Sequence, residues 1–338
     1  MNNILISICI PNYNRPDELL RLLKTVDASL VDQIEIVICE DRSPKMLEVR
    51  DKVNEFCESA LYHVNYVENE VNLGFDKNLR ACILNAKGEW ILYMGNDDEF
   101  VPGALNKLID FIKENKELGY ILKSHYFIHK NDKKERFRYY DGTKIFEPGL
   151  DSYVKMFRKS VFISGFTIRR ELTLPLLKDD FDGTLLFQLY LLAEVCLKYP
   201  SAYFDTPLTQ QHDEGIPEFG NSESEKALYT PGSVTVENSI RFLSGYFKIT
   251  KYIDKEHNLD STRIIMKDMS KYFYPSLAIQ RNKGFFKFLG YVKELNKIGF
   301  NSTIYYYIYV VGLLLFGKKI CDNLVRILKN IIGKTPEL

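Results

Sequence analysis

The sequence shows no excess of charge of either sign, because 45 lysines and arginines balance 45 aspartates and glutamates. A global electrostatic attraction to nucleic acid is therefore not expected. Six cysteines are present, but no two of them form a Cys-x-x-Cys pair or a zinc-finger spacing. Cys9 and Cys39 lie inside apolar runs, where a free thiol behaves as a small hydrophobic residue. We therefore expect reduced, structural cysteines, as in a cytosolic protein.

Long apolar runs are missing as well. The most apolar stretch, residues 303–316, is shorter than the roughly 20 residues that a membrane-spanning helix needs. We expect it to lie against a membrane or to pack on the protein body. The first residues, MNNILISICIPNYN, lack a basic leader followed by an apolar stretch and a cleavage site, so no signal peptide is predicted.

In the first half, short apolar runs alternate with segments of helical periodicity. The expected strands are residues 4–10, 35–39, 63–67 and 90–94, and the expected helices are 16–28, 45–61, 75–86 and 102–115. The last of these helices has Pro102 at its start, where a missing N–H costs little. This order predicts an α/β domain with a mostly parallel sheet covered by helices on both faces.

The second half is less regular. The pattern predicts strands at 119–128, 161–169 and 201–205, a charged hairpin tip at 131–138 and a helix at 184–199. Residues 210–224 are rich in glycine and acids, which is typical of a mobile loop, and helices follow from about 234. We expect a catalytic domain at 1–215, a helical region at 216–300 and an amphipathic tail at 301–338.

Polar residues gather where the four predicted parallel strands end. The segments that follow these strands are 11–15 (PNYNR), 40–44 (EDRSP), 72–78 (NLGFDKN) and 95–98 (GNDD). Ligands of open parallel sheets bind beyond the carboxyl ends of the strands, so these segments are expected to line one site. No glycine-rich phosphate loop follows the first strand, which argues against a dinucleotide-dependent oxidoreductase.

Two adjacent carboxylates, Asp97 and Asp98, form the sharpest feature. They repel each other unless a cation lies beside them, and magnesium or manganese takes such oxygen ligands while keeping positions open for phosphates. The alternative is an acidic turn that assists the start of the following helix. Glu40 can accept hydrogen bonds from a base or a ribose, Tyr13 can stack on a base, and Arg15 can meet phosphate charge.

The blocks SICIPNYNRPDELLRLL, EIVICEDRSP and NLGFDKNLRACILNAKGEWILYMGNDDEF resemble the family 2 glycosyltransferases, clearly over residues 4–112 and weakly to about 215. The resemblance implies a GT-A fold, a Rossmann-like nucleotide-diphospho-sugar transferase fold, with a C-terminal helical region. It also implies inverting transfer of a sugar from a nucleotide-sugar donor with a divalent metal, manganese or magnesium. Residues that match the donor side of the family are Pro11, Tyr13, Arg15, Glu40, Asp41, Lys77, Asn96 and Asp97.

Two parts of the family pattern differ here. Gly95 and Asn96 stand where the first acid of the metal motif is usual, so the metal ligands are expected to be Asp97, Asp98 and a later residue. His212 is the candidate for that third ligand, because it follows a predicted strand and opens the polar loop. Inverting transfer also needs one general base. Asp182 is the first candidate and Asp180 the second, although both could belong to a solvated loop that caps a helix.

Residues 318–334 predict a basic amphipathic helix. Ile320, Leu324, Ile327, Leu328 and Ile331 share one face, and five lysines and arginines stand against a single acid, Asp322. Such a helix suits the surface of an anionic bilayer, and packing on the domain or on a partner subunit is the alternative. The protein is therefore expected to be cytoplasmic and peripheral on the inner face of the cell membrane.

The sequence thus predicts a glycosyltransferase for cell-surface polysaccharide synthesis, with a glycan or a lipid-linked acceptor. The helical region could also support a homodimer. One alternative enzyme is a nucleotidyltransferase, which also uses a nucleotide-binding fold and paired acids, although it usually carries a glycine-rich loop that is missing here. A non-catalytic module that binds a nucleotide-sugar or a glycan is the alternative outside enzymes, and Asn96 in place of an acid is its best support.

Overall fold

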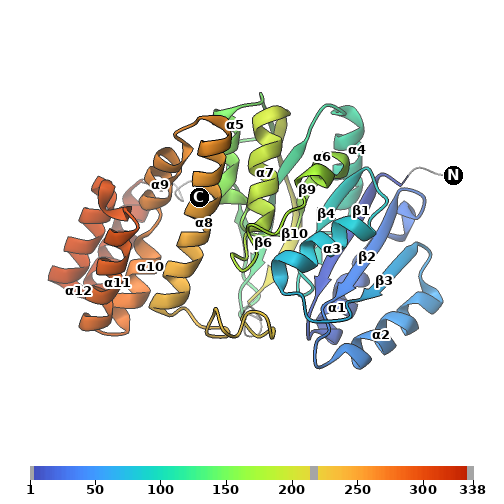
Figure 1. Ribbon diagram of the computed structural model, residues 1–338, viewed down its shortest axis with the longest axis horizontal. Helices are drawn as coiled ribbons and strands as arrows, with labels where there is room; N and C mark the ends of the chain where they lie inside the picture. The colour runs from blue at the N-terminus through green and yellow to red at the C-terminus, as the bar shows by residue number, and fades with distance from the viewer. Residues whose placement is uncertain (1–3, 214–219, 333–338) are drawn as a thin grey trace. The chain divides into compact units, whose positions relative to one another are not determined.

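The computed structural model describes residues 4–213 and 220–332. The chain divides into two compact units, Met1–Gly232 and Ser233–Leu338, which are described separately below. The first unit is built on one mixed sheet, and the second consists of helices (Figure 1).

Four parallel strands form the first half of the sheet, in the order β3-β2-β1-β4. Their bounds are β1 Ile6–Asn12, β2 Ile34–Glu40, β3 His63–Glu68 and β4 Trp90–Tyr93. All four predicted strands are therefore confirmed. The two central strands, β1 and β2, are buried along almost their whole length, which explains why each reads as a continuous apolar run.

Helices cover both faces of this sheet, as the sequence predicts (Figure 1). One face packs a continuous apolar core against α1 (Pro16–Leu23), α2 (Met46–Ser59) and α4 (Ala104–Glu114). Side chains of successive strand residues point to opposite faces, so Cys9 points away from this core. Its sulfur lies 3.8 Å from the carbonyl oxygen of Cys82 in α3 (Phe75–Asn85), on the other face. All six cysteines are free.

The second half of the sheet is mixed. β9 (Phe166–Arg169) runs antiparallel between β4 and β6 (Tyr120–Ile128), and β10 (Ser201–His212) runs parallel to β6. Three short strands pair antiparallel with β10 or β6: β5 Glu99–Phe100, β7 Lys134–Phe137 and β8 Lys144–Phe146. Two helices pack together nearby, α5 (Leu150–Phe157) and α7 (Phe187–Lys198), and the short α6 (Arg170–Thr173) follows β9.

Several predicted bounds were wrong. α4 begins at Ala104 rather than at Pro102, because Gly103 adopts a left-handed conformation at φ 71° and separates the two. The strand predicted at 161–169 exists only from Phe166, and the segment predicted as a charged tip contains β7. β10 continues past 205 to His212, because it pairs with β6 along this extension. The departures at β9 and β10 depend on pairing partners that are distant in sequence.

Strand register brings the ends of the parallel strands together. Asn12 pairs with Glu40, and Glu40 pairs with Glu68, at the carboxyl ends of β1, β2 and β3. The amide of Asp41 donates to the carbonyl of Asn12 at 3.0 Å, which continues the pairing beyond the strands. The carboxyl edge predicted to carry the chemistry is therefore a single continuous edge of the first unit.

The second unit is helical, as predicted from about residue 234. Its main helices are α8 Val236–His257, α9 Ser261–Lys271, α10 Tyr274–Asn282, α11 Phe285–Lys297 and α12 Ile304–Ile332. The hydroxyl of Thr235 accepts a hydrogen bond from the amide of Asn238 and so caps α8. Gly317, at φ 67°, kinks α12. Within the described residues, no helix has both the length and the hydropathy that crossing a membrane would require.

Candidate active site

The predicted acidic pair lies at the carboxyl edge, in the turn after β4. A Cβ placed on Gly95 would lie 3.2 Å from Asp97 Oδ1, 3.1 Å from Asp98 Oδ2 and 3.0 Å from the hydroxyl of Ser164. Both carboxylates therefore approach the same point beside Gly95, so closely that even a methyl group would be crowded there. Hard divalent cations prefer oxygen ligands of this kind, so the two acids fit a divalent metal that is completed by donor phosphate oxygens.

Asp98 is the more buried acid of the pair, with 3% of its surface exposed. Its carboxylate accepts a hydrogen bond from the hydroxyl of Ser164, which in turn accepts from the amide of Gly95 at 2.9 Å. Burial raises the pKa of Asp98 to about 7, and the neighbouring charge of Asp97 adds to the rise. Lys123 of β6 is fully enclosed nearby, and burial lowers its pKa to about 7 although Asp98 opposes that shift.

Basic residues surround Asp97 from the side of α1. Arg15 forms an ion pair with the Asp97 carboxylate, and Arg21 donates to the Asp97 carbonyl at 2.9 Å. Arg21 also lies 2.8 Å from a carboxylate oxygen of Glu99. The predicted role of Arg15 at a phosphate therefore requires that Arg15 exchange Asp97 for the phosphate, or bridge the two.

His212 contacts Glu99 rather than the acidic pair, with 3.2 Å between Nε2 and Oε1. Across residues 4–213 and 220–332, no three His, Cys, Asp or Glu side chains gather closely enough to hold a metal ion. The predicted set of Asp97, Asp98 and His212 is therefore not assembled, because β10 brings His212 to Glu99 instead. Two protein carboxylates remain as the candidate ligands.

Glu40 belongs to a buried polar network rather than to an open surface. One oxygen accepts from the side-chain amide of Asn12 at 2.5 Å, and the other accepts from the backbone amide of Ser43 at 2.8 Å. Asn12 in turn accepts from the side chain of Asn96 at 2.7 Å. Glu40 is fully buried, and this burial raises its pKa. The network joins the ends of β1, β2 and β4, so it fixes the shape of the edge.

Asp41 holds the loop after β3. Its carboxylate accepts from the backbone amides of Leu73 and Gly74, both at 2.8 Å, and from the side chains of Asn69 and Asn72. Burial raises its pKa to about 6, although these hydrogen bonds oppose the rise. A nucleotide-sugar could form a hydrogen bond with Asp41 only by displacing one of these partners.

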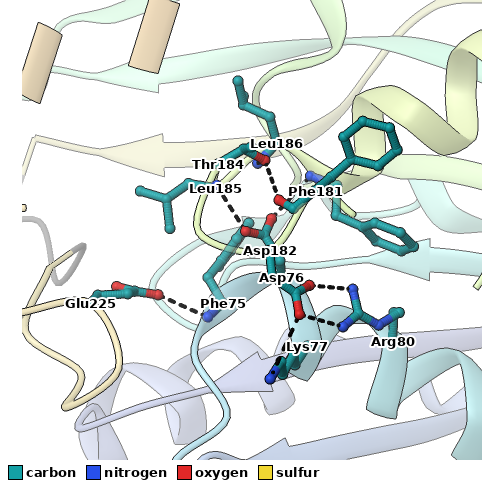
Figure 2. A network of polar contacts seen from close by, with 11 residues as sticks. Phe75, Asp76, Lys77, Arg80, Phe181, Asp182, Thr184, Leu185, Leu186 and Glu225 are labelled. Atoms are coloured by element: carbon teal, nitrogen blue, oxygen red, sulfur yellow. Dashed lines mark hydrogen bonds and ion pairs between the residues drawn. The ribbon is translucent and has the colours of Figure 1, made fainter. Parts of the chain in front are cut away.

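A second cluster of charged residues lies at the first turns of α3, where Lys77 and Arg80 contact Asp182 (Figure 2). Arg80 donates two hydrogen bonds to the Asp182 carboxylate, at 2.6 and 3.0 Å, and the Lys77 ammonium lies 3.7 Å from it. Lys77 is half-exposed, and 22% of the Asp182 side chain is exposed. The structure thus brings together the predicted donor lysine and the predicted base. Asp180 is exposed two residues away in sequence.

Asp76 fixes the loop that carries Asp182 (Figure 2). Its two oxygens accept from the backbone amides of Leu185 at 2.9 Å and Phe187 at 3.0 Å. Leu185 has a φ of 61°, which a leucine rarely adopts, so these bonds hold a locally unfavourable backbone. Burial raises the pKa of Asp76 to about 6, and the two amide bonds oppose that rise.

The segment 220–229 lies against the same edge. Glu225 accepts from the amides of Phe75 at 2.8 Å and Gly220 at 2.9 Å, and the Tyr13 hydroxyl donates to the carbonyl of Asn221 at 3.2 Å. The Tyr229 hydroxyl donates to the carbonyl of Gly183 at 3.0 Å. This segment therefore ties the loops after β1 and β3 to the loop of Asp182. Part of the predicted mobile loop, residues 214–219, lies outside the described residues.

Sequence reasoning found the strand-end segments but missed several residues that shape them. Arg21, Lys123, Ser164 and Glu225 were missed, and the roles of Asn12 and Asp76 inside the predicted segments were not foreseen. Lys123 had a readable signal, because a lysine inside the strand sequence YILKSHYFI is unusual for a buried strand. Ser164 and Glu225 had none, since their partners are 66 and 150 residues away in sequence.

Comparison with known proteins decides the family. Residues 7–172 match the family model described as Glycosyl transferase family 2. This part of the chain is a family 2 glycosyltransferase domain. The domain is 29% identical over 131 residues to the putative colanic acid biosynthesis glycosyl transferase WcaA of Escherichia coli K12, covering 39% of this chain and 43% of WcaA.

A second relative is the UDP-Glc:alpha-D-GlcNAc-diphosphoundecaprenol beta-1,3-glucosyltransferase WfaP of Escherichia coli. It is 28% identical over 130 residues, which cover 38% of this chain and 48% of WfaP. The matched segments thus span less than half of either relative. Among solved structures, S. aureus TarS residues 1–349 in complex with UDP-GlcNAc matches with a TM-score of 0.54 and 15% identity, over 80% of this chain and 73% of TarS. The glycosyltransferase domain has the GT-A fold.

Proposed function

We propose that this protein is an inverting glycosyltransferase that moves a sugar from a nucleotide-diphosphate donor to a glycan or lipid-linked acceptor. The observation that carries the proposal is the carboxyl edge itself. Asp97 and Asp98 approach the same point beside Gly95 there, and Lys77 and Asp182 lie together at the start of α3. Both features occur within the family 2 glycosyltransferase domain or just beyond its matched residues.

The donor is assigned to the edge between Pro11, Tyr13 and the loops after β2 and β3. Tyr13 can lie against a planar base, and Lys77 can meet the diphosphate charge. Glu40 and Asp41 act through the backbone that they hold, because their oxygens already accept protein hydrogen bonds.

Asp97 and Asp98 would hold a divalent cation, manganese or magnesium, with Asn96 anchored behind them to Asn12. Such a cation neutralises the charge that develops on a departing nucleoside diphosphate. Asp97 is also paired with Arg15. When Asp97 binds the cation instead, Arg15 is released and can bind the same diphosphate.

Asp182 is the proposed general base, with Asp180 as the alternative. As the acceptor hydroxyl attacks the anomeric carbon, the carboxylate of the base takes the hydroxyl proton while the bond to the diphosphate breaks. The double hydrogen bond from Arg80 keeps the Asp182 carboxylate in a fixed orientation. Asp76 supports that position through the backbone of Leu185 and Phe187.

The acceptor is proposed to be presented at a membrane surface, for cell-surface polysaccharide synthesis. WfaP, by its name, uses a diphosphoundecaprenol-linked acceptor, and WcaA is named for colanic acid synthesis. The helical tail predicted at 301–338 would bring the enzyme to the inner face of the membrane. This placement is a proposal that rests on the tail and on these relatives.

A thermal-shift screen with UDP-, GDP-, CDP- and dTDP-sugars, each with and without manganese, tests donor binding. A ligand that binds the native state raises its apparent stability by mass action. We expect one nucleotide class to raise the melting temperature, more with manganese than without. No shift with any of these donors would contradict the proposal.

The replacement of the usual first acid by Asn96 favours a second candidate, a non-catalytic module that binds a nucleotide-sugar. Both candidates predict a thermal shift, so turnover must separate them. Release of nucleoside diphosphate by the wild type, abolished in Asp98→Ala with an unchanged fold, supports the enzyme. Binding without any release, in the presence of acceptor extracts and manganese, supports the module.

A further inference from the structure

The second unit leaves an apolar face of α12 exposed. Ile304, Ile308, Val311 and Leu315 follow the 4-3-4 spacing of one helix face, and Leu315 is 70% exposed. The opposite side of the same helix is buried through residues such as Tyr306, Val310 and Leu313. After the kink at Gly317, Ile320, Leu324 and Ile327 of the apolar face predicted for the tail are exposed as well. Contiguous apolar surface of this kind marks an interaction site.

A second exposed apolar element lies beside the kink. Phe286, at the start of α11, is 85% exposed, and its neighbour Phe285 is also exposed. Arg281 connects this point to α12: its Nε donates to the carbonyl of Leu313 at 3.0 Å, and its guanidinium lies 5.4 Å from the centre of the Phe285 ring. The start of α11 is therefore next to the end of the first half of α12.

The charge of this region is strongly one-sided. Residues 281–327 contain eight lysines and arginines but only two acids, which gives a net charge of +6, while the rest of the chain carries −6. Both acids are already paired: Glu294 lies 2.7 Å from Lys297, and Asp322 pairs with Lys318. Lys287 and Lys319 are exposed beside the apolar residues. The chain as a whole is neutral, so the positive charge is concentrated here.

We propose that the kink end of the helical unit, defined as Phe285, Phe286, Leu315, Phe316, Lys287 and Lys319, is the surface that docks on an anionic lipid bilayer. The inference deepens the proposed membrane-surface function by naming the two helices that make the contact. Exposed phenylalanines flanked by lysines suit the interface, where rings enter the acyl boundary and ammonium groups meet lipid phosphates. α12 lies in the interface, since the described helices do not suit a spanning role.

Charge favours a bilayer over a second copy of the chain as the occupant. Two copies that met through this end would bring the +6 regions of both molecules together, and like charges at a contact oppose association. An anionic bilayer instead offers the opposite charge around an apolar interior. An anionic bilayer therefore accounts for both the exposed apolar residues and the lysines at this end.

Flotation of the full-length protein with vesicles tests the proposal. One vesicle contains phosphatidylglycerol and phosphatidylcholine, and the other contains phosphatidylcholine alone. The apolar variant is Phe286→Ser with Leu315→Ser, and its control is Leu47→Ser, an exposed leucine of α2. The charge variant is Lys287→Glu with Lys319→Glu, and its control is Lys107→Glu on α4. All substituted side chains are exposed, so folding is expected to be retained and is checked by circular dichroism.

We expect the wild type to float with the anionic vesicles and to bind them less as salt rises. Each double variant should lower the partition coefficient at least about tenfold, since both apolar burial and charge contribute. The two controls should stay within about twofold of the wild type. Equal binding of both double variants and the wild type would overturn the proposal.

A dimer is the other outcome to exclude. If the wild type fails to float and light scattering shows a dimer that the Phe286→Ser, Leu315→Ser variant converts to a monomer, a second copy covers this end and the proposal fails. Hydrolysis of the nucleotide-sugar donor is measured with the same preparations in detergent-free solution. This assay tests the proposed transferase activity independently of membrane docking. Flotation without hydrolysis would leave the docking surface standing and contradict the enzyme, and hydrolysis without flotation would do the reverse.

Discussion

Replacement of Asp76 by asparagine tests how the loop of the proposed base is held. Asp76 is buried, and its two oxygens accept from the amides of Leu185 and Phe187. An asparagine side chain of the same shape offers only one oxygen, so one of these amides loses its partner. The variant also removes a buried carboxylate that can ionise.

The pH dependence follows from the pKa of Asp76, which burial raises from 3.8 to about 6. Because the folded-state value lies above the unfolded one, the native state favours the protonated acid. Its stabilising effect is fully present below the unfolded pKa and is lost as pH rises through about 6. One pKa unit corresponds to about 1.4 kcal/mol, so this group lowers the free energy of unfolding by about 2 kcal/mol between about pH 4.5 and about pH 7.5.

The single tryptophan, Trp90, makes the measurement specific. It is fully buried in β4, so its fluorescence reports unfolding of the unit that contains Asp76. Urea unfolding of the wild type and of Asp76→Asn across this pH range gives the difference in unfolding free energy at each pH. We expect the wild type to lose about 2 kcal/mol relative to the variant as pH rises.

Asp110→Asn, at an exposed position of α4, is the control and should show a constant difference from the wild type. A constant difference for Asp76→Asn as well would refute the reasoning, because it would mean that the pKa of Asp76 is the same in the folded and unfolded states.

The remaining predictions concern the proposed site. Asp182→Asn should lower kcat by about 100-fold or more with little change in donor affinity, whereas Asp180→Asn should lower it by less than about tenfold; steady-state kinetics that rank them the other way would exchange their roles. Glu225→Gln leaves one amide without an acceptor, so the donor Kd should rise about three- to tenfold in calorimetric titration. Ser164→Ala removes the hydroxyl between Asp98 and Gly95 and should lower the free energy of unfolding by about 1–3 kcal/mol, measured by Trp90 fluorescence.

The parallel half of the fold could be predicted from the sequence because its signals are local. β1 and β2 are buried on both faces, so each appears as an uninterrupted apolar run. β5 carries no such signal, since it is a two-residue strand that forms by pairing with β10. β9 was predicted too long, at 161–169, because its start at Phe166 depends on pairing with β4. The start of α4 was misplaced because a proline is compatible with a helix start, whereas the left-handed Gly103 that actually precedes the helix depends on the surrounding turn.

The same contrast between local signals and distant contacts applies to the candidate site. The strand-end acids could be predicted because topology alone places the ends of parallel strands at one edge. The pairing of Arg80 with Asp182 could not, since 102 residues separate them and either could have remained a surface side chain. His212 was placed after a strand that was expected to end at 205, but it is the last residue of β10, and the neighbour that it meets is Glu99.

The most direct test of the central claim is donor hydrolysis by wild-type protein and by Asp98→Asn, with the nucleotide-sugar that the thermal-shift screen selects and with manganese present. If Asp97 and Asp98 hold the cation beside the donor diphosphate, the wild type releases nucleoside diphosphate and the variant, although folded by Trp90 fluorescence, loses at least about 100-fold in rate. Equal release by both proteins would contradict the account.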